Sequence, residues 1–355
     1  MQPLPTYPPR RNPARHWAAA LLVGGMAACS EAEAGPQAWP TRTLDEVVRW
    51  GPEIRLQESE TVITVAPVLH HDPGGGFLVA DRREAQGRLY DPAGRLRGQF
   101  GARGKGPGEF DGLVAALRLS SREIAAVDIS GKLALYDSSG ARLLRTWQTG
   151  VMPLYDAEVV GDSLLLLVGR GRDKAGPLLH VFHPRTGRVL RRFHPDPGSP
   201  GMARGSSMTA GFADATVYGD TIALVHSLSD TLSLFSPTGV PLGRIAIPFQ
   251  HFRSPPANMP RRPTREQTHA WLSTFSLASH AFRTADGGWL IQYQDRDGPA
   301  IHWRLLRMSA GGRRLFELRD TPQLLATDPE SGLLHFVHPA SEVPSVWAVA
   351  QLRPR

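Results

Sequence analysis

The chain has 355 residues, a length that suits one large domain or two ordinary ones. Its 40 Lys and Arg against 33 Asp and Glu give a formal net charge of +7. Its single cysteine excludes an internal disulfide framework, and its 36 Gly and 31 Pro favour many turns over long helices. The arginines are spread along the chain without a basic helix interleaved with aromatics, so we expect no nucleic-acid binding.

Residues 1–28 have the pattern of a signal peptide. Arg10, Arg11 and Arg15 precede the apolar run Trp17–Ala28, which has the length of a signal-peptide core and is too short to span a membrane. A twin-arginine signal is disfavoured, because an Asn-Pro pair follows Arg11 where apolar residues are expected.

The apolar run ends in Met-Ala-Ala-Cys at residues 26–29, which resembles a bacterial lipobox. This resemblance implies that Cys29 is lipidated and becomes the mature N-terminus; cleavage nearby by ordinary signal peptidase is the alternative. Residues 29–49 are then a lipidated cysteine and a flexible tether. Loss of residues 1–28 lowers the formal charge from +7 to +4. We expect an exported chain at the periplasmic or outer face of a bacterial membrane, touching it only through the lipid anchor.

From residue 50 onward a short apolar strand recurs, bounded each time by turn residues, as is typical of a buried strand. Most copies follow a tight turn such as Gly75-Gly76 or Gly287-Gly288. The six copies are FLVAD at Phe77, EIAAVD at Glu123, SLLLLVG at Ser163, TIALVH at Thr221, WLIQYQD at Trp289 and LLHFVH at Leu333.

The strand and turn that follow also recur. Tyr90 opens a Tyr-Asp-Pro-Ala-Gly turn, and matching turns begin at Tyr136, Phe182 and Phe235, spaced by 46, 46 and 53 residues. A period near 40–50 residues with about four strands per repeat is the mark of a β-propeller. Residues 266–274 are the one helix candidate. We therefore predict an all-β fold, a six-bladed β-propeller with four-stranded blades over residues 50–355.

Only three strands are recognisable in the sixth repeat, near Leu324–Thr327, Leu333–Val337 and Val346–Leu352. The segment Glu53–Glu58 precedes the first repeat and has strand character. We expect it to pair with the last blade and close the ring, which removes two exposed sheet edges.

The segment Gly101–Phe110, GARGKGPGEF, resembles the G-x-x-G-x-G-P-G-E-F signature of bacterial six-bladed propellers of the NHL and TolB-like kind. The resemblance is strongest over the first two repeats. It implies an exported or membrane-attached scaffold whose functional surface is made of loops, and it does not imply one activity. The glycines are explained by the sharp turn that the chain makes from one blade to the next. Alternatively, their backbone amides, together with Arg103 and Lys105, could hold an anion. Asp81 and Asp128 end equivalent strands, which indicates turn capping.

Two insertions, residues 194–211 and 248–275, lie between an outer strand and the next inner strand. Such connections emerge on the same propeller face as the loops between second and third strands, where ligands commonly bind. We predict a basic binding face there for a protein, peptide or glycan, with no cofactor and a monomeric chain. Its candidate residues are Arg82, Arg83, Arg103, Lys105, Arg170, Arg172, Arg253, Arg261, Arg262, Trp271, Asp295 and His338.

Two functions remain open. The first is a non-catalytic binding module acting through that face. The second is a metal-dependent lactonase- or lyase-like hydrolase, which needs carboxylates or imidazoles from several blades in the central channel. The inner strands are poor in acids, and the candidates there are Glu158, Asp214 and His280, with Asp156 as a further one. HExxH, CxxC and EF-hand patterns are absent from the sequence. Three or more such side chains lining the channel would favour the enzyme.

Overall fold

The computed structural model describes residues 42–59, 64–161, 163–171, 176–195, 213–254, 264–297 and 300–354. The predicted signal peptide, Cys29 and most of the predicted tether lie outside the described residues. In the described part of the chain, neither helix is long and apolar enough to cross a membrane.

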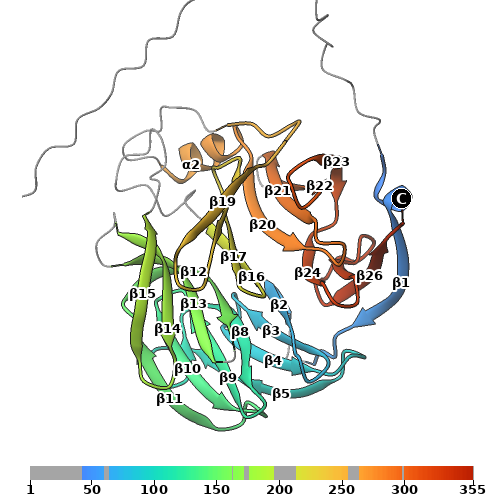
Figure 1. Ribbon diagram of the computed structural model, residues 1–355. Helices are drawn as coiled ribbons and strands as arrows, with labels where there is room; N and C mark the ends of the chain where they lie inside the picture. The colour runs from blue at the N-terminus through green and yellow to red at the C-terminus, as the bar shows by residue number, and fades with distance from the viewer. Residues whose placement is uncertain are drawn as a thin grey trace, which may run out of the picture. The chain divides into compact units, whose positions relative to one another are not determined.

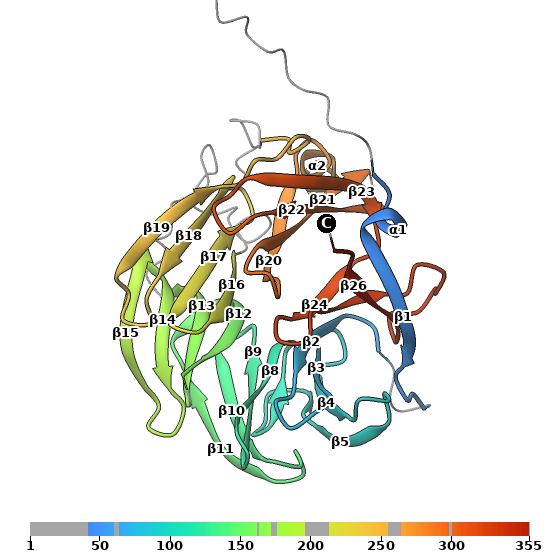
Figure 2. The same cartoon turned by 45° about the vertical axis from the view of Figure 1, so that its right-hand side comes forward.

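Six antiparallel sheets of four strands each surround a common axis, so the six-bladed β-propeller prediction is confirmed (Figures 1 and 2). The first blade is β2 (Pro67–His71), β3 (Phe77–Asp81), β4 (Gln86–Tyr90) and β5 (Leu96–Phe100); the second is β8 (Leu113–Ser120), β9 (Glu123–Asp128), β10 (Lys132–Asp137) and β11 (Leu143–Gln148). The third is β12 (Val151–Val160), β13 (Leu164–Gly171), β14 (Pro177–His183) and β15 (Arg188–Pro195); the fourth is β16 (Ala213–Tyr218), β17 (Thr221–His226), β18 (Thr231–Phe235) and β19 (Pro241–Ala246). The fifth is β20 (Leu277–Arg283), β21 (Trp289–Asp297), β22 (Ala300–Met308) and β23 (Arg314–Thr321); the sixth is β24 (Leu324–Asp328), β25 (Leu333–Val337), β26 (Val346–Leu352) and β1 (Val48–Arg55).

The second strand of each blade is apolar on both faces because both faces are covered by neighbouring blades. Every residue of β3 is buried, as the run FLVAD predicts. The apolar core of the described residues divides into six clusters between adjacent blades and a seventh around Trp271. One of the six joins Leu290 and Leu305 of the fifth blade to Leu334 and Phe336 of the sixth. Each blade thus depends on its neighbours for its core.

The ring is closed by the N-terminal strand, as predicted, but that strand begins earlier than expected. β1 pairs antiparallel with β26, and only Glu53, Ile54 and Arg55 of the predicted segment Glu53–Glu58 belong to it. The register shifts between Trp50 and Glu53, where Gly51 and Pro52 interrupt the pairing and conceal the strand in the sequence. The one-turn helix α1 (Leu44–Val47) leads into β1, and Val47 accepts a hydrogen bond from the Arg353 amide at 2.9 Å.

The two recurrent aspartates cap turns, as predicted. Asp128 Oδ2 accepts hydrogen bonds from the amides of Asp111 and Gly112 at 2.7 and 2.9 Å, and its Oδ1 accepts one from Ser130 at 2.7 Å. Asp81 likewise binds the amides of Val65 and Arg83 at 2.6 and 2.9 Å. Each carboxylate therefore fixes the end of a second strand to the segment that enters the same blade.

The glycine-rich segment is a small structural unit, in which β6 (Ala102–Arg103) pairs in parallel with β7 (Glu109–Phe110). The Glu109 carboxylate accepts a hydrogen bond from the Gly106 amide at 2.7 Å, so the loop supplies its own anion. Lys132 Nζ donates to the carbonyl oxygens of Gly106 and Glu109 at 3.1 and 2.6 Å. These contacts support the structural explanation of the glycines and leave Gly106 unavailable to an external anion.

The helix candidate at 266–274 is confirmed as α2 (Arg265–Leu272), which lies over the fourth and fifth blades (Figure 2). It is part of the second predicted insertion. Residues 255–263 of that insertion and residues 196–212, which include most of the first insertion, lie outside the described residues.

Removing the closing strand should destabilise the whole ring. A chain of residues 57–355 lacks β1 and the buried side chains of Val47 and Val48, and we expect it to lose roughly 3 kcal/mol or more of unfolding free energy and to aggregate. The matched control, residues 42–355, keeps β1 and should melt as the full-length protein does. Urea unfolding of the two truncations is the measurement, and equal midpoints would contradict closure through β1.

Candidate functional site

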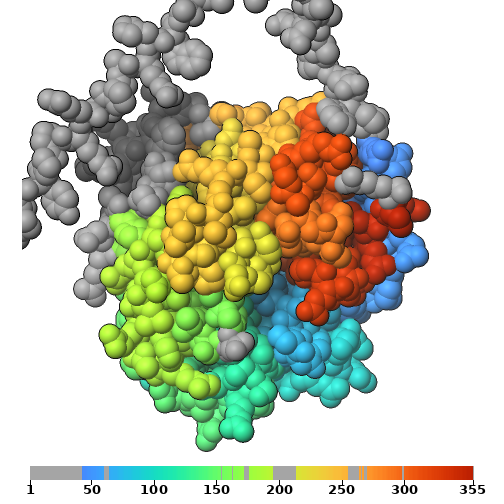
Figure 3. Space-filling view, viewed as in Figure 1, coloured from blue at the N-terminus to red at the C-terminus, as the bar shows by residue number. Residues whose placement is uncertain are grey.

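A cavity of about 950 Å³ lies on the propeller axis and is lined by the inner strands of all six blades, β2, β8, β12, β16, β20 and β24 (Figure 3). Its mouth is formed by turns between first and second strands, including Asp72–Gly74, Ser120–Ser121, Gly161 and Pro329. We call this cavity the central pocket. It opens on the face opposite to the loops between second and third strands, where the sequence placed the binding face.

Four ionisable side chains from three blades meet in the central pocket. Asp156 and Glu158 are two residues apart on β12 and therefore project from the same face of that strand. Asp214 on β16 and His280 on β20 join them, with His280 Nδ1 2.7 Å from Asp214 Oδ1. Asp156 Oδ2 accepts a hydrogen bond from the Ala215 amide at 3.0 Å. We call these four residues the acidic cluster.

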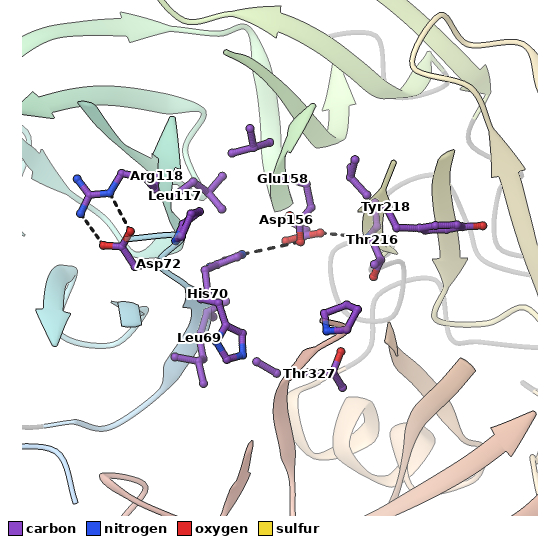
Figure 4. A pocket seen from close by; sticks show the side chains of 18 of the residues that line it. Leu69, His70, Asp72, Leu117, Arg118, Asp156, Glu158, Thr216, Tyr218 and Thr327 are labelled. Atoms are coloured by element: carbon purple, nitrogen blue, oxygen red, sulfur yellow. Dashed lines mark hydrogen bonds and ion pairs between the residues drawn. The ribbon is translucent and has the colours of Figure 1, made fainter. Parts of the chain in front are cut away.

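His70 reaches the acidic cluster from β2, on the opposite side of the pocket (Figure 4). Its Nε2 lies 4.0 Å from Glu158 Oε1. Burial, followed by the charges of His71 and His280, lowers the pKa of His70 to about 4, so the ring is neutral at pH 7. His70 therefore offers Glu158 no positive charge.

Two carboxyl groups of the acidic cluster, those of Asp156 and Glu158, have raised pKa values. Burial raises the pKa of Asp156 to about 7, and the nearby charge of Asp214 adds to the effect. Burial, followed by the charges of Asp156 and Asp214, holds the pKa of Glu158 well above its ordinary value. Burial lowers the pKa of His280, but the charge and hydrogen bond of Asp214 outweigh it and leave that pKa raised. In the cluster, Asp214 is therefore paired directly with His280. Among the described residues, no cation forms an ion pair with Asp156, and Glu158 has only His70 at 4.0 Å.

The walls around the acidic cluster are mostly apolar. Leu117, Val159, Phe282 and Leu325 are among the residues that line the pocket with the cluster. At the mouth the Arg118 guanidinium binds Asp72 through two hydrogen bonds, of 3.1 and 2.6 Å, so these two charges satisfy each other. A small molecule entering here would meet apolar walls and then carboxylates.

The channel residues named as metal candidates, Glu158, Asp214 and His280, do share one pocket with Asp156. Asp214 and His280 are bonded to each other, however, and no group of three His, Cys, Asp or Glu in the described ranges has the spacing of a metal site. Sequence reasoning missed His70. His70 could have been identified from its position on an inner strand, because inner strands line the same channel as the named candidates.

The residues predicted for the basic face are dispersed. Arg103 donates to the carbonyl oxygens of Asp111 and Arg83, and Lys105 forms an ion pair with Asp111 at 3.6 Å, so these side chains join two loops. Arg170 is buried. Arg172, Arg261 and Arg262 lie outside the described residues.

Other members of the predicted face have structural contacts. Trp271 is 7% exposed and packs edge-to-face on Phe275 with ring centroids 4.4 Å apart, so it offers no aromatic surface. His338 Nδ1 accepts a hydrogen bond from the Ala340 amide at 3.2 Å. Arg82 directly follows β3, and burial lowers its pKa while the charge of Asp156 raises it.

Arg253 and Asp295 are the predicted pair that the structure brings together, 3.3 Å apart. They line a hollow of about 760 Å³ on the fifth blade with Arg304 and Arg319. Asp295 also accepts hydrogen bonds from Arg304 and from Ser276 at 2.5 Å each. This hollow lies on the side of the propeller that carries the insertions.

No protein-family model and no curated protein matches the chain. Among solved structures, a member of the DUF4221 family from Bacteroides vulgatus is 9% identical with a TM-score of 0.61, covering 86% of this chain and 97% of that one. A protein from Bacteroides fragilis, whose name describes it as exported, is 12% identical with a TM-score of 0.59, covering 89% and 98%. At these identities the likeness shows the propeller fold. The NHL and TolB-like resemblance stays a prediction.

Asp156 should make stability depend on pH. Its pKa of about 7 in the fold exceeds that of an unfolded aspartate, so between about pH 4 and 7 the folded state holds a proton that the unfolded state has lost. Ionising Asp156 therefore lowers stability as pH rises through this range. We expect Asp156→Asn to raise the unfolding free energy at pH 8 by about 1 kcal/mol or more relative to its effect at pH 5.

Urea unfolding at the two pH values tests this expectation. Asp220→Asn, at an exposed position in the turn after β16, is the control and should have the same small effect at both. A pH-independent effect of Asp156→Asn would show that Asp156 ionises as freely as a surface carboxylate.

Proposed function

We propose that this propeller is a binding module that takes a small organic cation, with an ammonium group, into the central pocket. The observation that carries the proposal is the meeting of Asp156, Glu158 and Asp214 in one cavity, where His280 alone supplies a close cationic partner from within the described residues. An ammonium group would place three donors among these oxygens and form charge-assisted hydrogen bonds in a poorly hydrated site.

Cation binding would also release protons. The pKa of Asp156 is raised to about 7 and that of Glu158 is raised well above its ordinary value, both mainly by burial. A bound positive charge lowers both values, so the carboxyls ionise as the ligand enters. Affinity should therefore increase with pH until the carboxyls are ionised or the ligand amine loses its own charge.

A hydrolase in the same channel is the second candidate. A carboxyl whose pKa lies near neutrality, as that of Asp156 does, is suited to general acid–base chemistry. The metal-dependent form of this hypothesis has less support, because Asp214 and His280 use their facing atoms on each other. Binding is preferred because the described pocket residues include no cysteine or lysine, and their serines, Ser120, Ser121 and Ser138, lie at the mouth, at the end of β8 or in the turns that follow β8 and β10.

We also infer export and lipid anchoring at Cys29, supported by the residues of the signal peptide and by the structural likeness to the Bacteroides fragilis protein, which is named a putative exported protein. The hollow around Arg253 and Asp295 supports a separate role for the insertion-bearing face in contacting a protein, peptide or glycan. In this proposal the two faces have different tasks, and the chain acts as a monomer without a cofactor.

The binding proposal is tested with 1,5-diaminopentane, using 1,5-pentanediol as an uncharged analogue of the same length. We expect the diamine to bind, the diol to bind at least tenfold more weakly, and protons to be released on binding. Isothermal titration calorimetry in two buffers of different ionisation enthalpy measures both affinity and proton release.

The double variant Asp156→Asn/Glu158→Gln should lose at least tenfold in diamine affinity, whereas Glu330→Gln, at an exposed turn outside the pocket, should bind as the wild type does. Equal affinity for the diamine and the diol, or a double variant that binds normally, would rule the proposal out.

A further inference from the structure

Arg283, at the end of β20, is held rigidly by two aromatic rings. Its guanidinium carbon lies 4.4 Å from the ring centroid of Tyr218 and 4.7 Å from that of Trp289. The two rings pack edge-to-face, 5.2 Å apart, and Trp289 is fully buried. Stacking on aromatic faces fixes the plane of a guanidinium and leaves its N–H edge available for hydrogen bonds.

The guanidinium of Arg283 differs from its neighbours in having no anionic partner. Arg118 is bonded to Asp72, and Arg307 is bonded to Asp286. Within the ranges that the structure describes, no carboxylate comes within 4.0 Å of the Arg283 side-chain nitrogens, and no side-chain hydrogen bond involves them. A fixed cation with unused donors is suited to a carboxylate from outside the chain.

Arg283 and Tyr218 both border the central pocket, at the end of their strands that reaches the mouth. His280 lies three residues earlier on β20, and Asp214 lies four residues before Tyr218 on β16. At about 3.3 Å per strand residue, Arg283 is therefore roughly 10 Å from His280 along β20, and Tyr218 is roughly 13 Å from Asp214 along β16. The carboxylate nearest the mouth on the opposite wall, Asp72, is already bonded to Arg118.

We propose that the ligand of the central pocket is a short peptide with free termini, whose ammonium group binds the acidic cluster and whose carboxylate binds Arg283. This inference rests on the proposed function, since the acidic cluster is taken as the ammonium site. A peptide of three or four extended residues spans about 10–14 Å, which matches the separation of the two ends. The volume of about 950 Å³ and the apolar walls leave room for its side chains.

The experiment compares tetra-alanine with free termini, the same peptide as its C-terminal amide, and the same peptide N-acetylated. We expect the free peptide to bind wild-type protein at least tenfold more tightly than either blocked peptide, by isothermal titration calorimetry. The amide removes the charge that would meet Arg283, and the acetyl group removes the charge that would meet the acidic cluster.

Arg283→Met keeps the apolar stem over Tyr218 and removes the charge. It should reduce affinity for the free peptide to the level of the amide and leave the affinity for the amide unchanged. Arg122→Met, at an exposed position in the turn between β8 and β9 outside the pocket, is the matched control and should change neither affinity. Thermal melting checks that each variant is folded, and if Arg283→Met is not, the wild-type comparison of acid with amide decides.

The outcomes separate the two proposals. If the amide and 1,5-diaminopentane bind as tightly as the free peptide, the carboxylate site is wrong and the cation site stands. If neither the diamine nor any peptide with a free ammonium group binds, the proposed function itself is wrong. If the free peptide binds better than its amide but Arg283→Met binds both as wild type does, another group holds the carboxylate and the assignment to Arg283 is overturned.

Discussion

Apolar packing between neighbouring blades is the constraint on which the rest of this structure depends. The six inter-blade clusters each draw residues from two blades, so a blade separated from its neighbours would expose both faces of its second strand. Such an arrangement is stable only when the sixth blade meets the first. The N-terminal segment serves that closure twice, because β1 completes the sixth sheet and because Val47 of α1 and Val48 of β1 enter the cluster between the fifth and sixth blades.

The inner strands are where this packing ends, and polar groups are tolerated there because they face the axis. The groups of the pocket also link one blade to the next. Asp156 of the third blade binds the Ala215 amide of the fourth, and Asp214 of the fourth binds His280 of the fifth. Thr327 of the sixth donates to the Arg283 carbonyl of the fifth at 2.9 Å. The residues of the pocket therefore also help to hold these three pairs of neighbouring blades in register.

The sequence predicted much of the fold because blade strands and turns leave local signals. Recurring apolar runs, tight turns and a regular period predicted six blades and the capping role of Asp81 and Asp128, and residues 266–274 were the one helix candidate. The start of β1 was missed because Gly51 and Pro52 resemble an interruption when no partner strand is known. Trp271 was assigned to a surface because it lies in an insertion, yet α2 folds its ring onto Phe275. The repeat pattern does not cover the insertions, so it could not predict how the residues of α2 pack.

The site was only partly predictable for a related reason. Strand position identified Asp156, Glu158, Asp214 and His280 as channel residues, because inner strands of a propeller line its axis. Which end of the channel is open depends on how far each turn reaches over it, and strand periodicity carries no information on that. The role of Arg283 depends on two rings, Tyr218 and Trp289, that approach from different blades and different strands.

Arg82 shows why the acidic cluster still has room for a ligand. It directly follows β3, and the charge of Asp156 favours its protonated form. If Arg82 neutralised the cluster, the pKa of Asp156 would be depressed; it is raised to about 7, with burial and the charge of Asp214 as the leading causes. The attraction from Arg82 is thus too weak to offset the burial of the carboxyl. The carboxyls of Asp156 and Glu158 are therefore available to a cation that enters through the mouth, which is formed by the turns between first and second strands. In the proposal, the ammonium group of the ligand is that cation.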